Sequence, residues 1–256
     1  MALKLLSFDV WDTLIIDDSD ELYRKKNGLP SKSEEREDLY LNAYCSPNIS
    51  PELVREAMSF MQESFTHQWK NKFKTPGVRW RLNELEKFLG RSQKKPFVLD
   101  EEVKKMLISS LEEMELKYPI KPMPGAKEFL MQWRSTYPEI KVGIISDAIY
   151  SPGRCIRKIL ENVELVEYFD YFSFSDEVGA SKPSSKIFSY LMNQASVMPN
   201  EIVHIGDRIA NDIVGAEEFG AVGVLCQVHQ QNQEKSMEMK AFDQYVQLNS
   251  ILGELI

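Results

Sequence analysis

The chain has 256 residues, of which 43% are hydrophobic, and its formal net charge is -8. This apolar content can supply the core of one large domain or two modest ones, so we expect a folded globular protein. The acidic balance argues against binding of nucleic acid or of an anionic membrane surface. No apolar stretch is long enough to span a bilayer, and no cleavage signature follows the first residues. Three widely spaced cysteines without metal-like spacing indicate reduced thiols in a soluble, cytoplasmic protein: Cys45, Cys155 and Cys226.

Short apolar runs alternate with helical patterns outside one long central segment. Runs of nearly continuous hydrophobicity are typical of strands that are buried on both faces. They occupy residues 3–8, 140–146, 201–206 and 221–226, with a weaker run at 168–175. Helical patterns lie between them, at residues 126–137, 154–163, 184–195 and 211–220. This βαβα order predicts an α/β fold with a doubly wound, Rossmann-like parallel sheet that binds ligands beyond the carboxyl ends of its strands.

Residues 17–121 interrupt the alternation and contain only helical patterns. The expected helices cover residues 34–44, 51–70, 78–90 and 100–118, joined by turns that contain proline or glycine. An acidic DDSD segment precedes this insert, and the proline-rich PIKPMPG follows it. We therefore predict a core formed by residues 1–16 and 122–256, and a separate helical domain formed by residues 17–121.

Polar side chains follow four of the predicted core elements. Each has an ordinary structural explanation, such as capping a helix or ending a strand. Together they are harder to explain in this way, because the carboxyl ends of parallel strands meet at one edge of the sheet. The residues concerned are Asp9, Ser146, Lys182, Asp207 and Asp212.

Four segments resemble the four motifs of the haloacid dehalogenase (HAD) superfamily, in the order of that family. They are FDVWDTL, GIISD, SKP with its following helix, and GDRIAND, of which the last is the most specific. The resemblance covers most of the chain outside the insert. It implies an aspartate nucleophile at Asp9 and a mostly helical cap domain, inserted after the first motif, that closes over the site.

The resemblance also implies a magnesium site. A carboxylate at Asp9 can attack phosphorus to form an acyl phosphate, and a nearby Mg²⁺ would reduce the repulsion between the two anions. Mg²⁺ prefers oxygen ligands and keeps several waters. The expected protein ligands are Asp9 and Asp207, the backbone carbonyl of Trp11, and Asp212 at the edge of the site.

A small phosphorylated substrate is the expected partner. Lys182 would bind both the nucleophile and a phosphate oxygen, while the Ser146 hydroxyl would bind another. Backbone N–H groups near Asp12 and Thr13 are the remaining expected phosphate donors, and Asp147 is also assigned to substrate binding. The identity of the substrate and the oligomeric state cannot be read from the sequence.

Trp11 is where the chain departs from the family pattern. Phosphatases of the family carry a second aspartate there, which protonates the leaving oxygen and later deprotonates the attacking water. An indole N–H donates hydrogen bonds but is no usable acid near neutral pH. Asp12 is one residue late, so its side chain should point elsewhere. Other acids could replace the missing one only if loops fold over the site: Asp17, Asp18, Asp20 or Asp147.

Three functions remain open at this stage. The retained metal-side aspartates favour a magnesium-dependent phosphatase with weakened general-acid catalysis. A 2-haloacid dehalogenase uses the same aspartate without metal and also lacks the second carboxylate. A non-catalytic member would bind a phosphorylated ligand or a protein. The segment at residues 78–88 has aromatic and basic residues that could line a pocket, but its spacing favours a buried stripe of Trp80, Leu82, Leu85 and Phe88.

Overall fold

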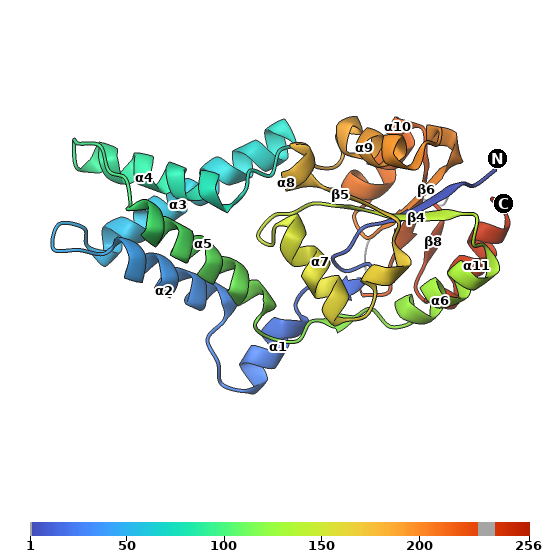
Figure 1. The fold of residues 1–256 in the computed structure, drawn as a ribbon, viewed down its shortest axis with the longest axis horizontal. Helices are drawn as coiled ribbons and strands as arrows, with labels where there is room; N and C mark the ends of the chain where they lie inside the picture. The colour runs from blue at the N-terminus through green and yellow to red at the C-terminus, as the bar shows by residue number, and fades with distance from the viewer. Residues whose placement is uncertain (1, 230–238) are drawn as a thin grey trace.

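The core of the protein is a six-stranded parallel sheet, as expected. The structure is a computed structural model that describes residues 2–229 and 239–256. The strand order is β5-β4-β1-β6-β7-β8, and every neighbouring pair is parallel (Figure 1). Five strands match the predicted apolar runs: β1 (Leu5–Phe8), β4 (Lys141–Ser146), β5 (Tyr171–Phe174), β6 (Ile202–Gly206) and β7 (Val222–Cys226). The two-residue β8 (Ala241–Phe242) at the edge was not predicted.

Helices cover both faces of this sheet, so the doubly wound arrangement is confirmed. On one face, Leu6 and Phe8 of β1 belong to the same hydrophobic cluster as residues of α6 (Ala126–Thr136), α7 (Gly153–Asn162) and α11 (Tyr245–Gly253). Leu5 points to the opposite face, where it packs with α9 (Ser185–Ala195) and α10 (Gly215–Phe219). Short elements complete the core: η1 (Val166–Tyr168), α8 (Ser175–Val178), η2 (Pro199–Glu201) and the π-helix η3 (Ile209–Val214).

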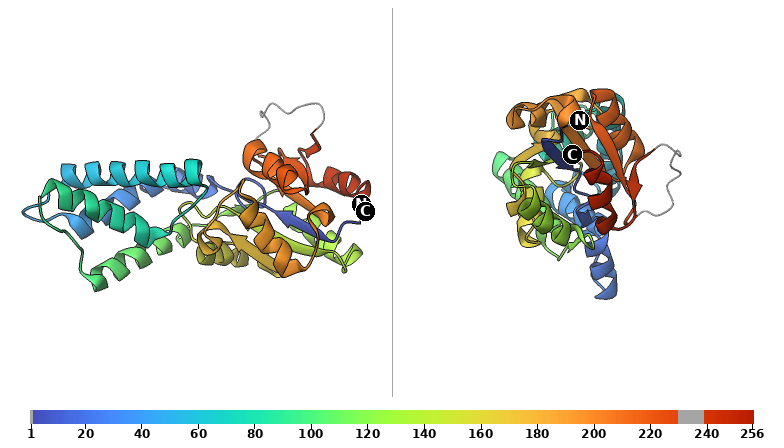
Figure 2. Two further views of the ribbon diagram at one scale, coloured as in Figure 1. Left: turned by 90° about the horizontal axis from the view of Figure 1, so that it is seen from above. Right: turned by 90° about the vertical axis from the view of Figure 1, so that its right-hand side faces the viewer.

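The central insert forms a helical unit at one end of the sheet (Figures 1 and 2). Its helices are α1 (Ser19–Lys26), α2 (Lys32–Tyr44), α3 (Pro51–Lys72), α4 (Val78–Ser92) and α5 (Glu101–Leu116). Helices α2 to α5 share a hydrophobic cluster of their own, in which Leu82 and Leu85 are fully buried. Of the expected stripe, Phe88 packs at the edge of that cluster, whereas Trp80 is only partly buried.

A short antiparallel pair joins the chain where it enters and leaves the insert. Strand β2 (Ile15–Ile16) pairs with β3 (Lys121–Pro122), so the two connections run side by side. The division into a core and a separate helical domain at residues 16/17 and 121/122 stays a prediction. Among residues 2–229 and 239–256, no helix is long and apolar enough to cross a membrane.

Candidate active site

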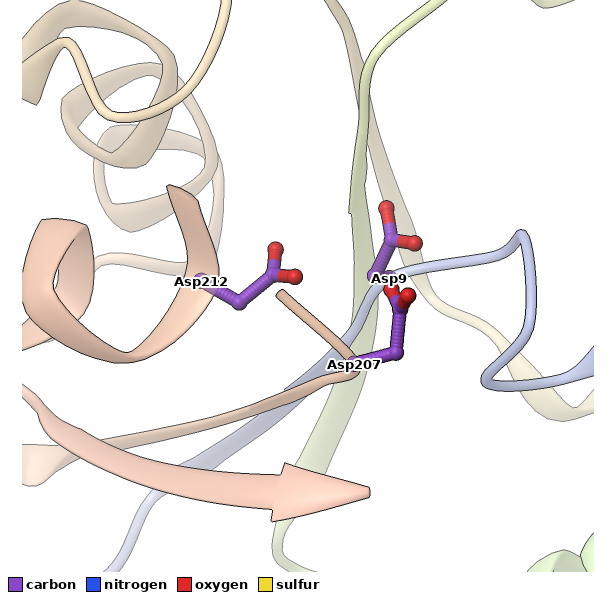
Figure 3. A group of neighbouring side chains, drawn as sticks. All are labelled: Asp9, Asp207 and Asp212. Carbon is purple, nitrogen blue, oxygen red and sulfur yellow. The ribbon is translucent and has the colours of Figure 1, made fainter. Parts of the chain in front are cut away.

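Three aspartates from two strand ends and one helix face one another at the carboxyl edge of the sheet (Figure 3). Asp9 follows β1, Asp207 follows β6, and Asp212 lies on η3. Each offers a carboxylate oxygen, these oxygens lie within 4.8 Å of one another, and all three side chains are buried. Gly206 makes this approach possible, because a Cβ at that position would lie 2.3 Å from the Asp212 carboxyl carbon. The sequence prediction that these residues meet is confirmed.

Lys182 supplies a positive charge to two of these carboxylates. Its Nζ donates hydrogen bonds to Asp9 Oδ1 and to Asp212 Oδ1, and the lysine is 3% exposed. Burial opposes the charge, but the Asp212 and Asp9 carboxylates outweigh it and raise the pKa of Lys182 above its ordinary value. The ammonium therefore stays charged, next to the predicted nucleophile.

Asp207 is the carboxylate that Lys182 does not reach. Its Oδ1 is buried and has no hydrogen-bond partner among the described residues. Burial, together with the neighbouring Asp9 and Asp212 charges, raises the pKa of Asp207 to about 8. A buried oxygen without a donor, within a cluster of oxygen ligands, fits a hard divalent cation such as Mg²⁺. The residues present are therefore compatible with the implied metal.

Asp212 is held rigidly from both sides. Its Oδ2 accepts the backbone N–H of Arg208 at 2.9 Å, and its Oδ1 lies 3.3 Å from His204 Nε2. Burial opposes ionisation of Asp212, yet Lys182 and His204 hold its pKa well below the ordinary value. Burial lowers the pKa of His204, whose Nδ1 lies 3.0 Å from the Ser7 hydroxyl. His204 is thus a buried residue with hydrogen-bond partners on both ring nitrogens, and it orients Asp212.

Three buried hydroxyls on segments next to the aspartates and the lysine have no hydrogen-bond partner in the described part of the chain. Ser146 ends β4, Thr13 follows the nucleophile loop, and Ser181 precedes the lysine. Buried hydroxyls are normally hydrogen-bonded, so unpartnered ones need an explanation. The Ser146 hydroxyl therefore stays available for the phosphate oxygen predicted from the sequence.

The loop after Asp9 forms a tight turn. Asp12 has a positive φ of 53°, and its N–H donates to the Ile15 carbonyl at 2.8 Å. The Thr13 N–H lies 3.4 Å from the Val10 carbonyl oxygen. Both N–H groups have acceptors within the turn, and their role as phosphate donors stays a prediction. The Asp12 side chain accepts the Asp17 N–H, which agrees with its predicted direction away from the nucleophile.

Asp147 lies beside Lys182 and lines the cavity, and its assignment to substrate binding stays a prediction. Its Oδ1 accepts the Lys182 backbone N–H at 2.9 Å, and its Oδ2 lies 3.4 Å from Trp69 Nε1 and 3.5 Å from Asn211 Nδ2. Both oxygens thus have protein partners, although the residue lines the cavity. The sequence did not predict Trp69 or Asn211, because neither follows a strand, and Trp69 lies 78 residues before its partner along the chain.

A cavity of about 490 Å³ lies between the aspartate site and the helical unit. Trp11, Trp69 and Arg208 line it together with acids from the connection to the insert. The Trp11 side chain is only partly buried and packs at the edge of the core cluster. The indole therefore occupies a position from which a side chain can face a bound molecule.

The four acids that could replace the absent general acid differ in their surroundings. Asp20 is buried in an ion pair with Lys32 at 2.9 Å, so the nearby ammonium stabilises its carboxylate in the charged form. Asp17 and Asp18 line the cavity. Burial raises the pKa of Asp17, although Lys32 opposes this shift. Of the four candidates, Asp17 lines the cavity and has a raised pKa, although its side chain is exposed to solvent by surface area.

Comparison with known proteins agrees with this geometry. The model of the haloacid dehalogenase-like hydrolase family matches residues 3–220, so the chain belongs to this family of hydrolytic enzymes. The chain is 32% identical over 127 residues to a glyceraldehyde 3-phosphate phosphatase from Pyrococcus furiosus, a match that covers 50% of each chain. The chain thus spans about half the length of such curated relatives.

Solved structures share the whole fold at low sequence identity. A 2-haloacid dehalogenase from Pseudomonas syringae superposes with a TM-score of 0.67 at 19% identity, covering 99% of this chain and 100% of that one. The putative HAD-hydrolase YfnB from Bacillus subtilis has a TM-score of 0.59 at 14% identity, with 98% and 99% covered. Both a phosphatase and a dehalogenase are therefore among the similar proteins, and the site itself must distinguish them.

Proposed function

We propose that the protein is a magnesium-dependent phosphatase that acts on a small phosphorylated molecule through an aspartyl phosphate on Asp9. The observation that carries this proposal is the unpartnered, buried Asp207 Oδ1 beside Asp9 and Asp212. Without a metal this oxygen has no donor among the described residues, and a buried polar atom that is left unsatisfied costs about 1 to 3 kcal/mol. In a magnesium-dependent phosphatase, the bound cation would be the partner of the Asp207 oxygen.

The proposed reaction assigns a residue to nucleophilic attack, to phosphate binding and to the metal, but not to protonation of the leaving group. Asp9 would attack phosphorus, and Lys182 holds the attacking carboxylate while its third proton remains free for a phosphate oxygen. The Ser146 hydroxyl would donate to another phosphate oxygen. Asp9, Asp207, Asp212 and the Trp11 carbonyl would hold Mg²⁺, which when bound neutralises charge between the nucleophile and the phosphoryl group. YfnB, which shares the fold, is described as bound to magnesium.

Magnesium binding can be measured without turnover. We expect saturating Mg²⁺, at about 100 times its dissociation constant, to raise the Tm by about 5 to 10 °C. Asp207→Asn should lose most of this shift because it removes a charged ligand. Asp38→Asn, an exposed position on α2, should keep it. EDTA should suppress activity and magnesium should restore it. Crystals soaked in magnesium without octahedral density among the three aspartates would contradict the assignment.

One observation favours the dehalogenase instead, namely Trp11 in place of the second carboxylate. Such an enzyme attacks carbon and needs no metal. Beryllium fluoride with magnesium separates the two, because it mimics a phosphoryl group on an aspartate. The combination should raise the Tm of a phosphatase more than either component alone. Neither component should change the Tm of a dehalogenase. A non-catalytic phospholigand-binding member would bind a phosphorylated compound without releasing phosphate.

We expect the helical unit to move as a cap over the aspartates. It has its own hydrophobic cluster, and much of its contact with the core is polar, such as the 2.9 Å hydrogen bond from Ser151 to Glu115. The β2–β3 pair provides a short hinge. Small-angle scattering with and without magnesium and beryllium fluoride should show a smaller radius of gyration in the ligated state. Identical scattering curves would count against closure. The structure of YfnB, according to its description, reveals interdomain movement.

A further inference from the structure

A second cavity continues the first one into the helical unit. Its volume is about 420 Å³, and it shares Arg36, Gln62, Glu115 and Tyr150 with the cavity above the aspartates. Residues of α2, α3, α4 and α5 line it. The two cavities therefore adjoin and together form one elongated chamber, which reaches from Asp147 and Arg208 beside the aspartate site into the helical unit.

Arg81 on α4 is a buried cation that lines the second cavity and contacts residues of the first. It is 4% exposed, and no carboxylate of the described residues lies within 4.0 Å of its guanidinium, as an ion pair would require. Its Nη2 donates to the Ile149 carbonyl, its Nη1 lies 3.3 Å from Gln62 Oε1, and its guanidinium carbon lies 3.5 Å from the Phe65 ring centroid. Charged residues this deeply buried are normally paired.

The neighbouring charges do not supply the missing counter-ion. Arg36 has its own partner in Glu115, at 2.9 Å, and the other Glu115 oxygen accepts the Ser151 hydroxyl. Glu63 lines the same cavity but is exposed and lies beyond ion-pair distance of Arg81. Burial lowers the pKa of Arg81 to about 10, so the side chain still carries its charge at neutral pH.

Helix α3 gives the length of the chamber. Trp69 contacts Asp147 beside the aspartate site, and Gln62 contacts Arg81 where the two cavities adjoin. The two residues are two helical turns apart, which corresponds to a rise of about 10 Å. Aromatic rings of Phe65, Trp69 and Tyr150 line the space between them.

We propose that Arg81 binds a second anionic group of the substrate, so that the protein acts on elongated phosphomonoesters with a carboxylate or second phosphate about 10 Å from the phosphoryl group. This assignment rests on the proposed phosphatase function and specifies its substrate class. The forked guanidinium suits either anion, since both accept two parallel hydrogen bonds. The aromatic rings would contact a flat or apolar middle portion.

A purely structural role is the competing explanation. Arg81 also connects α4 to the core loop through the Ile149 carbonyl, so its removal could disturb the site without any anion being bound. The two roles differ in one respect. A structural connection affects all substrates equally, whereas an anion-binding residue affects only those that carry the second anion.

The test uses two matched aryl phosphates, 4-(4-phosphonooxyphenyl)butanoate and the corresponding butanamide. They share the reacting group and differ only in the charge of the distal group. We expect wild-type kcat/KM to be about 10- to 100-fold higher for the carboxylate, as befits a charge-assisted hydrogen bond. Arg81→Gln should reduce this ratio to about one, while leaving the amide within a few-fold. Arg79→Gln, on the same helix and exposed, should keep the wild-type ratio.

The other outcomes of this test each decide whether Arg81 binds the second anion. A wild-type ratio near one, or an equal loss on both compounds in Arg81→Gln, overturns the proposal. If Arg81→Gln does not fold, Arg81→Lys replaces it, and the loss of the forked geometry should still lower the ratio several-fold; an unchanged ratio again overturns it. If neither compound is hydrolysed, the phosphatase assignment fails, and calorimetric binding of the same two compounds to the magnesium-loaded protein decides the role of Arg81 separately.

Discussion

Asp9→Asn is expected to abolish turnover while leaving the fold intact. The amide is nearly the same size as the carboxylate but is no nucleophile, so the aspartyl phosphate cannot form. The backbone N–H of residue 9 donates to the Ile205 carbonyl and does not depend on the side chain. Lys182 keeps its second partner, Asp212, so the lysine is not left as an unpaired buried charge. The measurement is phosphate release by protein freed of contaminating phosphatases, together with the unfolding transition.

Asp12→Asn is the matched control for this variant. Asp12 lies three residues later, and its carboxylate contacts the Asp17 N–H rather than Lys182. We expect its kcat to stay within about tenfold of wild type, because the turn loses only part of its support. Wild-type activity in Asp9→Asn would show that another residue is the nucleophile. Similar losses in both variants would show that the loop, rather than the Asp9 carboxylate, determines the rate.

The sequence predicted the parts of the site that follow buried strands. Asp9, Ser146 and Asp207 follow runs of nearly continuous hydrophobicity, and parallel pairing then brings their ends together. Asp212 follows from its spacing after Asp207, since one turn of helix returns its side chain to the sheet. The insert was equally recognisable, because a period near 3.6 replaces the short apolar runs over about a hundred residues.

Features that depend on tertiary contacts could not be predicted in the same way. Trp69 and Arg81 lie within helices. The hydrophobic period of a helix predicts which of its faces is buried, but not which side chains contact the residues at the edge of that face. The hydrogen-bond partners of Asp12 and Asp147 depend on a positive φ and on side-chain rotation, neither of which the residue types determine. The edge strand β8 is too short to produce a periodic pattern.

Trp11→Asp is expected to raise turnover of alkyl phosphates by up to about 10² to 10⁴, the usual contribution of general acid–base catalysis. In the proposed mechanism the wild-type chain has its nucleophile and metal ligands, but an indole stands where the family resemblance places the proton donor. Its kcat/KM should therefore fall steeply as the leaving-group pKa rises, with aryl and acyl phosphates cleaved far better than alkyl or sugar phosphates. The new carboxylate should flatten this dependence, because it protonates the leaving oxygen. Loss of indole packing at the cavity wall will offset part of the gain.

Trp11→Asn separates proton donation from the change in size. The amide matches the aspartate in volume but transfers no proton, so it should retain the steep dependence while suffering the same loss of packing. The measurement is kcat/KM for a series of aryl and alkyl phosphates with all three proteins. An equally shallow dependence in each would show that another acid already donates the proton. Asp17 is then the residue to test, because it lines the same cavity and burial raises its pKa. In that case Asp17→Asn should steepen the leaving-group dependence of the wild-type chain, and Trp11 would serve to pack against the substrate.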